Sequence, residues 1–333
     1  MIAVPHMLFV RSLIAGVPVG LLLTTLAAAL AFGGPSAPPP LISVIDAVKQ
    51  RDRSDLPGLL RYRARDGAQL AYRAYPAADP VGAAVVVHGS VGSSADVHEI
   101  AKALRDARVT AYAPDVRGHG ASGPRGDIAY IGQLDDDLAD FLNELDRQGA
   151  PARRVLIGHS AGGGFALRIA AEPLAARFAG AVLLAPYLGD GAPTNRPGIG
   201  GWVGVGWPRV VALTMLHDVG VDAWGGLPVV EFAVGPRDAP YVTPAYSFRL
   251  AANFGPHRDW RGDIAGARIP LVVLVGADDQ VFYPDRYAPV LADAPDARVE
   301  VLPGIDHISL GDDPSALAVI AANTRPLLAG ARR

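Results

Sequence analysis

Beyond residue 56, hydrophobic and polar positions follow two periods that alternate along the chain. Residues 83–87 (AAVVV) and 271–275 (LVVLV) are unbroken apolar runs, which are typical of strands buried on both faces. Between such runs the apolar residues recur at helical spacing, as at Leu134, Leu138 and Phe141, which predicts amphipathic helices. The pattern therefore indicates repeated strand and helix units.

A hairpin is expected first, from residues 61–65 and 69–75 around Asp66 and Gly67. Further strands are predicted over residues 83–87, 109–113, 154–157, 179–184, 271–275 and 298–302. Helices are predicted over residues 97–104, 134–145, 161–171, 287–291 and 314–328. This alternation favours an α/β fold whose mostly parallel sheet carries helices on both faces. Such sheets bind ligands at the carboxyl ends of their strands.

The first 55 residues have a different pattern. Residues 12–45 contain no charged side chain, and residues 13–32 form an apolar stretch long enough, as a helix, to cross a bilayer. Ala29 and Ala31 match the small-x-small pattern of a signal-peptide cleavage site, so a retained transmembrane anchor and a cleaved export signal both fit. Residues 33–40, GGPSAPPP, predict a stiff extended spacer.

We therefore divide the chain into an anchor or signal (1–32), a Pro-rich linker and juxtamembrane segment (33–55), and a folded domain (56–330). The flanking charges, Arg11 on one side and Lys49 and Arg51 on the other, do not set the membrane orientation. We expect the chain to be membrane-anchored or exported, with the folded domain outside the cytoplasm.

Charge and composition exclude several classes of function. The 30 Lys and Arg against 33 Asp and Glu leave a formal net charge of −3, without the basic excess that nucleic-acid binding needs. The chain has no Cys, which excludes thiolate nucleophiles, disulfides and cysteine-ligated metals. Because no cluster of metal-ligand residues stands at a recognised spacing, we expect no metal and no cofactor.

Most of the chemical information lies in residues 158–162, Gly-His-Ser-Ala-Gly, between a predicted buried strand and a small-residue helix. This is G-x-S-x-G in the strand-turn-helix context that a nucleophile elbow requires. A bulky side chain two positions either side of Ser160 would collide with the strand or the helix. The turn exposes the serine hydroxyl, so we interpret Ser160 as a nucleophile.

A serine nucleophile needs a histidine base and a carboxylate that orients the imidazole. The strand predicted over residues 271–275 is followed by Asp278 and Asp279, and the strand over residues 298–302 by His307. His307 is the only histidine after these acids, so the chain order is Ser, Asp, His. We predict His307 as the base, and we favour Asp279 over Asp278 as the acid.

Two backbone NH groups are candidates for the oxyanion hole. Ala161 stands at a predicted helix start, where NH groups are unpaired. Gly89, after the first central strand, lets the backbone bring the NH of Ser90 close. We expect His88 to be structural. The G-x-G-x-x-G at residues 118–123 is not taken as a dinucleotide site, because Pro124 and polar residues follow instead of a helix.

The segments HGS at 88–90, DVRGHGAS at 115–122, GHSAGG at 158–163, GADD at 276–279 and DH at 306–307 together resemble the α/β-hydrolase superfamily. The similarity is greatest to its branch of monoacylglycerol lipases, lysophospholipases and serine aminopeptidase-like enzymes, and it covers roughly residues 59–328. It implies a serine hydrolase with Ser160, Asp279 and His307 as the catalytic triad, and backbone donors at Ser90 and Ala161. It also implies a cap inserted between the sixth and seventh strands.

The predicted cap, about residues 187–268, combines aromatic residues with flexible positions. It contains Trp202, Trp207 and Trp224, with glycines at 198, 200, 201, 204 and 206. Packing onto the core explains these residues, but so does a mobile apolar lid that admits an acyl chain. On the second interpretation the enzyme cleaves monoacyl lipid esters through an acyl-enzyme. Alternatives are a small-ester esterase, a serine aminopeptidase, a cofactor-free perhydrolase, and a non-catalytic membrane-tethered module.

Overall fold

The computed structural model describes residues 20–41, 52–239 and 242–330. Residues 20–32 are helical, and residues 33–41 form no helix or strand. The apolar stretch predicted as an anchor, residues 13–32, begins outside the described residues. In the described ranges, no helix is long and apolar enough to cross a bilayer.

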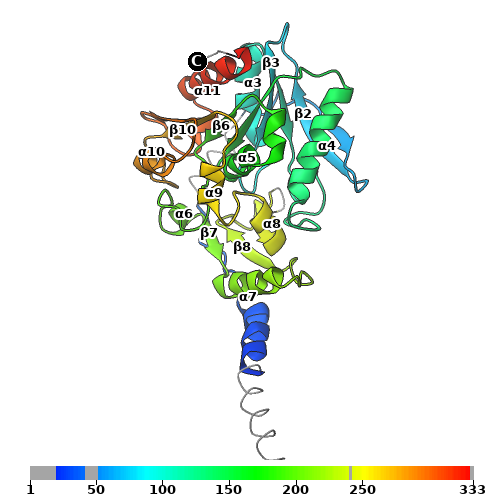
Figure 1. Ribbon diagram of the computed structural model, residues 1–333, viewed down its shortest axis with the longest axis vertical. Coiled ribbons are helices and arrows are strands. Elements are labelled where there is room, and N and C mark those ends of the chain that lie inside the picture. Colours follow the sequence, from blue (N-terminus) through cyan, green and yellow to red (C-terminus); the bar gives the residue numbers. More distant parts are fainter. Residues whose placement is uncertain (1–19, 42–51, 240–241, 331–333) are drawn as a thin grey trace, which may run out of the picture.

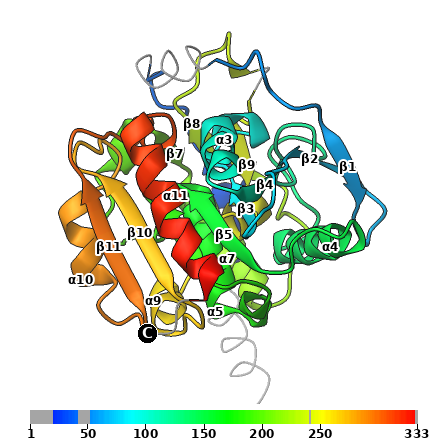
Figure 2. The same ribbon diagram turned by 90° about the horizontal axis from the view of Figure 1, so that it is seen from above.

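A mixed sheet forms the centre of the molecule (Figures 1 and 2). Within the described ranges it has eight strands in the order β1-β2-β4-β3-β5-β6-β10-β11; β2 pairs antiparallel with both β1 and β4, and the other neighbouring strands pair parallel. The strands are β1 Leu60–Arg63, β2 Gln69–Tyr75, β3 Gly82–Val87, β4 Val109–Pro114, β5 Arg154–His159, β6 Ala181–Leu184, β10 Leu271–Gly276 and β11 Ala297–Leu302. The predicted α/β fold with a mostly parallel sheet is confirmed.

Helices cover both faces of this sheet. Helices α3 and α11 pack together on one face, whereas α4 and α5 lie on the other, joined by an ion pair of 3.0 Å between Arg168 and Asp135 (Figure 2). The helices are α3 His98–Asp106, α4 Gln133–Arg147, α5 Ala161–Ala171, α9 Trp260–Ala265, α10 Tyr287–Val290 and α11 Pro314–Ala329. Short 3₁₀ turns are η1 Ser94–Val97, η2 Pro173–Arg177, η4 Pro284–Arg286 and η5 Ser309–Gly311.

Local sequence accounts for these boundaries. All residues of β3 and β10 are buried, as their unbroken apolar runs predicted. At the start of α11 the Asp313 side chain accepts from the NH groups of Ser315 and Ala316, Pro314 takes the first helical position, and Gly330 ends the helix with φ of 67°. The observed elements therefore begin and end within a few residues of the predicted ones.

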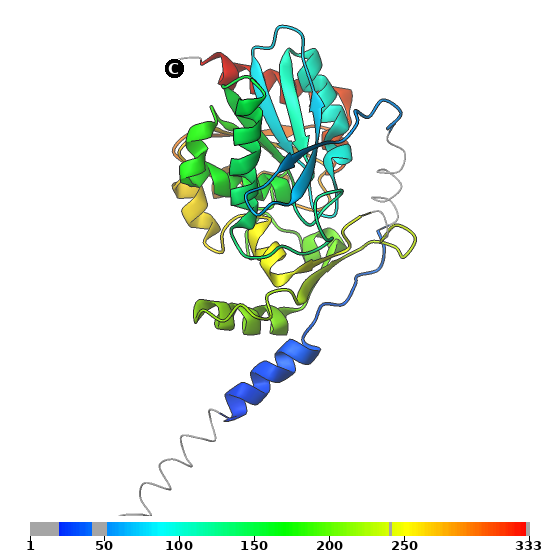
Figure 3. The same ribbon diagram turned by 90° about the vertical axis from the view of Figure 1, so that its right-hand side faces the viewer.

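The segment between β6 and β10 is more regular than the sequence pattern suggested. The sequence pattern predicts no strand there, but the structure has an antiparallel sheet of β7 Val203–Val205, β8 Pro228–Phe232 and β9 Ala245–Ser247. The helical elements are α6 Gly198–Gly201, α7 Trp207–Asp218 and α8 Phe248–Asn253. These strands have three to five residues, too few to show a clear alternation. This cap lies at the carboxyl ends of the parallel strands (Figure 3).

Candidate active site

Ser160 lies at a strained turn between β5 and α5. Its φ and ψ are 54° and −116°, a conformation that non-glycine residues rarely adopt. Its NH donates to Leu184 O at 2.9 Å, and its carbonyl oxygen accepts from the NH of Tyr187 at 3.0 Å. These bonds to the end of β6 and the loop behind it hold the strained backbone in place.

The glycines around Ser160 stand where no side chain fits. A Cβ on Gly158 would collide with Gly162 O, and one on Gly162 would collide with His88 O. A Cβ on Gly163 would lie 2.9 Å from Pro186. The steric requirement inferred from the motif is therefore met by contacts with the helix and with neighbouring loops.

His307 and Asp279 come together from loops that follow the neighbouring parallel strands β11 and β10. His307 Nδ1 lies 2.8 Å from Asp279 Oδ2. The other carboxylate oxygen accepts from the NH groups of Val281 at 2.7 Å and Phe282 at 2.8 Å. Asp279 is completely buried and His307 is 5% exposed. Because both carboxylate oxygens are engaged, the carboxylate has one orientation, and it faces the imidazole.

The two neighbouring carboxylates have different surroundings. Asp278 is exposed, and the structure does not bring it to His307. Burial would raise the pKa of Asp279, but the charge and hydrogen bond of His307, with the two backbone NH groups, lower that pKa below its ordinary value. Asp279 is therefore ionised at neutral pH and in contact with the imidazole.

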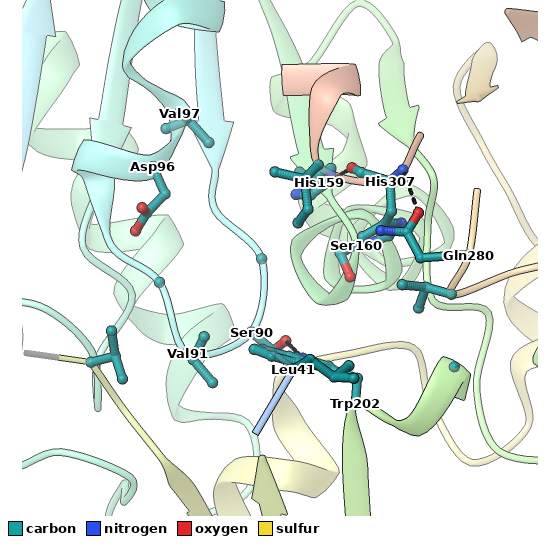
Figure 4. A pocket seen from close by; sticks show the side chains of 16 residues that line it. Leu41, Ser90, Val91, Asp96, Val97, His159, Ser160, Trp202, Gln280 and His307 are labelled. Carbon is teal, nitrogen blue, oxygen red and sulfur yellow. Dashed lines mark hydrogen bonds between the residues drawn. The ribbon is translucent and has the colours of Figure 1, made fainter. Parts of the chain in front are cut away.

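Three side chains that we did not single out from the sequence hold His307 in position. His159 Nε2 lies 3.0 Å from His307 O, and Gln280 Oε1 accepts from the NH of His307 at 3.2 Å (Figure 4). The ring of Phe282 meets the imidazole edge-on, with centroids 5.3 Å apart. His159 and Gln280 adjoin predicted site residues in the chain, but adjacency alone did not indicate which loop they would contact.

The loop after β3 brings Ser90 into the same pocket as Ser160 and His307. Gly89 allows this close approach, because a Cβ there would lie 3.3 Å from both Ser160 Cβ and His159 Nδ1. Ala161 occupies the first position of α5, whose leading NH groups have no acceptor within the helix. The two predicted oxyanion donors thus belong to a loop that closely approaches Ser160 and to the residue that follows Ser160.

The cap supports this loop through Tyr246. Val91 has a strained φ of 60°, and its NH donates to the Tyr246 hydroxyl at 3.0 Å. That hydroxyl lies 2.7 Å from His119 Nε2. Burial lowers the pKa of His119 well below its ordinary value, so the imidazole is neutral and accepts the phenolic proton.

His88 has the structural position that we expected. It is completely buried, its Nε2 accepts from the NH of Val116 at 3.1 Å, and its Nδ1 lies 2.8 Å from Gly89 O. The glycine-rich loop after β4 folds around Asp115, which accepts from the NH groups of Ser94 at 2.7 Å and Ala121 at 2.8 Å. The bonds of His88 and Asp115 thus join the loop after β3, which lines the pocket, to the loop after β4.

A largely apolar pocket lies between these loops and the cap. Its apolar side chains are those of Leu41, Val91, Val97, Trp202, Val242, Val281 and Ile308. Figure 4 shows Ser160 and His307 on one side of the pocket and Trp202 on another, where its Nε1 donates to Ser90 Oγ at 3.1 Å. Nowhere in the described ranges do three His, Asp or Glu side chains gather in a way that could hold a metal ion.

Comparison with known proteins identifies relatives of this chain. Residues 78–223 match the family model described as serine aminopeptidase, S33. A non-heme chloroperoxidase of Kitasatospora aureofaciens is 30% identical over 256 residues, which are 73% of this chain and 90% of that protein. A monoacylglycerol lipase of Mycolicibacterium smegmatis is 26% identical over 254 residues, 72% of this chain and 86% of that protein.

The fold has known counterparts as well. A soluble variant of monoglyceride lipase from Saccharomyces cerevisiae superimposes with a TM-score of 0.60 at 18% sequence identity. The match covers 83% of this chain and 96% of that one. At this level of identity the likeness concerns the fold alone.

Proposed function

Because this chain belongs to the α/β-hydrolase superfamily, in its branch of monoacylglycerol lipases and serine aminopeptidase-like enzymes, we propose that it hydrolyses carboxylic esters through an acyl-enzyme on Ser160. One observation carries the mechanism: His307 Nδ1 lies 2.8 Å from the buried Asp279 carboxylate, in a pocket that Ser160 also lines. A serine, a histidine and an ionised carboxylate are the parts of a nucleophilic triad.

In the first half of the reaction, Ser160 Oγ attacks the ester carbonyl carbon while His307 Nε2 takes the hydroxyl proton. Asp279 keeps the other imidazole proton on Nδ1 and stabilises the imidazolium that forms. The NH groups of Ser90 and Ala161 bind the negative charge that develops on the carbonyl oxygen. His307 then gives its proton to the departing alcohol, and the acyl group remains on Ser160.

In the second half, water enters the site of the departed alcohol. His307 Nε2 removes a proton from this water as its oxygen attacks the acyl carbon. The same two backbone donors bind the second oxyanion. Collapse of this intermediate breaks the bond to Ser160 Oγ, returns the proton from His307 to the serine and releases the carboxylic acid.

We propose medium-chain or long-chain monoacyl esters as substrates. The support is the apolar character of the pocket wall next to Ser160, formed by Trp202, Val281 and Ile308. An acyl chain gains about 0.8 kcal/mol of binding for each methylene that it buries there. The monoacylglycerol lipase relative is consistent with this class of substrate.

Placement beside a membrane is a further part of the proposal. Trp207, Val211 and Met215 stand at i, i+4 and i+8 of α7 and are 51%, 55% and 46% exposed. The helix of residues 20–32 lies at the same end of the molecule as α7 (Figures 1 and 3), and its last residue, Phe32, is exposed. An exposed apolar surface of this kind supports contact with lipid.

Perhydrolysis is a second candidate, favoured by the similarity to a non-heme chloroperoxidase. In this reaction hydrogen peroxide replaces water as the acceptor. One peroxide oxygen attacks the acyl carbon while its proton goes to His307. The bond to Ser160 Oγ then breaks, His307 returns the proton to the serine, and a peracid is released. The test is peracid formation from a carboxylic acid and hydrogen peroxide, compared with ester hydrolysis by the same preparation.

Hydrolysis itself is tested with p-nitrophenyl esters from acetate to decanoate. We expect kcat/KM to rise with chain length by up to about fourfold for each buried methylene. Ser160→Ala should lower kcat/KM at least about 10³-fold, whereas Ser54→Ala, at an exposed serine, should keep the wild-type value. Acetate as the best ester would instead indicate a small-ester esterase, and faster cleavage of aminoacyl amides would indicate an aminopeptidase.

A further inference from the structure

The segment of residues 29–41, here called the strap, lies against the cap instead of crossing open solvent. Near its start, Gly33 O accepts from the NH of Arg209 in α7 at 3.3 Å. At its end, the NH of Leu41 donates to Ala233 O, just after β8, at 3.1 Å. Both ends of the predicted spacer are therefore attached to the cap.

Arg209 fixes the first end of the strap. This cation is 9% exposed, and its guanidinium donates to Leu30 O at 2.9 Å, to Ala31 O at 3.3 Å and to Pro228 O at 2.8 Å. Leu30 and Ala31 belong to the last turn of the helix of residues 20–32. A positive charge at a helix C-terminus, bonded to otherwise unpaired carbonyl groups, is favourable. Arg209 therefore joins this helix to the cap strand β8.

Two cap glycines stand where the strap crosses. A Cβ on Gly204, in β7, would collide with Ser36 O. A Cβ on Gly206 would lie 2.6 Å from Gly33 O and from Pro35 N. The sequence left packing and a mobile lid open for these positions, and their surroundings give a further reason for glycine: the absence of a side chain makes room for the strap backbone.

The far end of the strap reaches the pocket that contains Ser160. The NH of Leu41 donates to Ala233 O, and the NH of Ala233 donates to Trp202 O at 2.9 Å, so the three backbones lie side by side. Leu41 is half-buried and lines the same pocket as Trp202 and Ser160 (Figure 4). A residue from outside the predicted folded domain thus forms part of the pocket wall.

We propose that the strap is part of the substrate site and that Leu41 is a specificity-determining residue whose side chain packs against the acyl chain. The inference rests on the proposed ester hydrolysis at Ser160, and it assigns to the N-terminal segment a role in catalysis beyond attachment. Because Arg209 and the two crossing glycines hold the strap on the cap, the position of Leu41 depends on contacts distant from the reacting atoms.

The first experiment compares Leu41→Ala and Leu41→Trp in the full chain, with Leu59→Ala, at an exposed leucine outside the pocket, as control. The readout is the ratio of kcat/KM for p-nitrophenyl octanoate to that for acetate. Leu41→Trp fills the pocket and should lower this ratio at least about tenfold, while Leu41→Ala removes contact with the chain and should lower it about fourfold. Leu59→Ala should keep the wild-type ratio. Unchanged ratios in both Leu41 variants would overturn the assignment.

The second experiment uses the absence of Cys from the chain, which makes Leu41→Cys a unique thiol. Reaction of Ser160 with a long-chain alkyl fluorophosphonate should slow maleimide modification of Cys at position 41 at least about fivefold, because the bound chain covers the pocket wall. A methyl fluorophosphonate should slow it less. Full labelling of Ser160 with no protection of the thiol would refute the proposal.

A third variant separates the strap from the ester chemistry. Adding Arg209→Ala to Leu41→Cys should speed maleimide modification at least about fivefold, since the strap then opens more often. Arg258→Ala, at a guanidinium that is 78% exposed, is the matched control and should leave the rate unchanged. If Ser160 does not react with the fluorophosphonate and no ester is cleaved, the proposed function fails. The maleimide rates of the two arginine variants still test whether Arg209 holds the strap on the cap. Equal maleimide modification rates in the two arginine variants would refute the proposed attachment of the strap.

Discussion

Replacing Asp279 by Asn perturbs the imidazole without changing the size of the side chain. In the native site one carboxylate oxygen accepts from the NH groups of Val281 and Phe282, and the other lies 2.8 Å from His307 Nδ1. An amide has only one oxygen. If that oxygen keeps the two backbone donors, the NH₂ group faces His307, and Nδ1 must then accept a hydrogen bond instead of donating one.

The change of tautomer gives the magnitude of the effect. With Nδ1 unprotonated, a neutral His307 carries its proton on Nε2, which can no longer remove the proton of Ser160. In a serine triad this substitution costs about 10⁴ in kcat, equivalent to about 5.5 kcal/mol at 1.36 kcal/mol per factor of ten. Turning the amide over instead would place its NH₂ against two backbone NH groups, which is also unfavourable.

The assay is kcat/KM for p-nitrophenyl butyrate, with circular dichroism and thermal unfolding to verify the fold. Asp278→Asn is the matched control, because its side chain is exposed and should leave kcat/KM within about twofold of wild type. We expect Asp279→Asn to lose about 10⁴-fold. A folded Asp279→Asn variant with more than a tenth of wild-type activity, or an equal loss in Asp278→Asn, would refute the reasoning.

Three further results are expected. Tyr246→Phe removes the acceptor for the NH of Val91, so kcat for p-nitrophenyl acetate should fall about tenfold with little change in KM. Equal kcat values in the variant and the wild type would show that the loop carrying Ser90 does not need this hydrogen bond. Burial lowers the pKa of His119 below 6.5 in the folded protein. As the pH falls, the unfolded chain therefore binds a proton at this residue before the folded chain does, and the free energy of unfolding should decrease below about pH 6.5. Urea unfolding at pH 7 and pH 5 measures this loss, and it should be smaller in His119→Gln; the same loss in both proteins would contradict it. Full-length protein should sediment with membranes and be released by detergent but not by salt, and its recovery in the soluble fraction would contradict the membrane placement.

Some parts of the site could be predicted because they depend on short segments. The turn at Ser160 needs a strand, small residues and a helix in succession, and all of these lie within about twenty consecutive positions. The cap could not be predicted in the same way. Its strands are short, and they pair across insertions, as β7 does with β8 over the whole of α7.

Glycines illustrate the same difference. Gly158 and Gly162 were assigned from the motif, because the atoms with which a side chain would collide are nearby in sequence or belong to the adjacent strand. The contacts of Gly204 and Gly206 could not be predicted in this way, since the chain that excludes a side chain there, residues 33–36, is about 170 positions earlier. A sequence pattern shows that a glycine is present, and only the fold shows which backbone lies against it.

The sequence by itself determined the alternation of strands and helices, the α/β class and the identity of the residues proposed for catalysis. These follow from periodicity and from local turn geometry, which act over a few residues. Only the tertiary structure decided that Asp279 rather than Asp278 meets His307, that Tyr246 supports the loop carrying Ser90, and that Leu41 enters the pocket. Each of these contacts joins segments distant in the chain, and it forms because burial in a common core brings their loops to the same edge of the sheet.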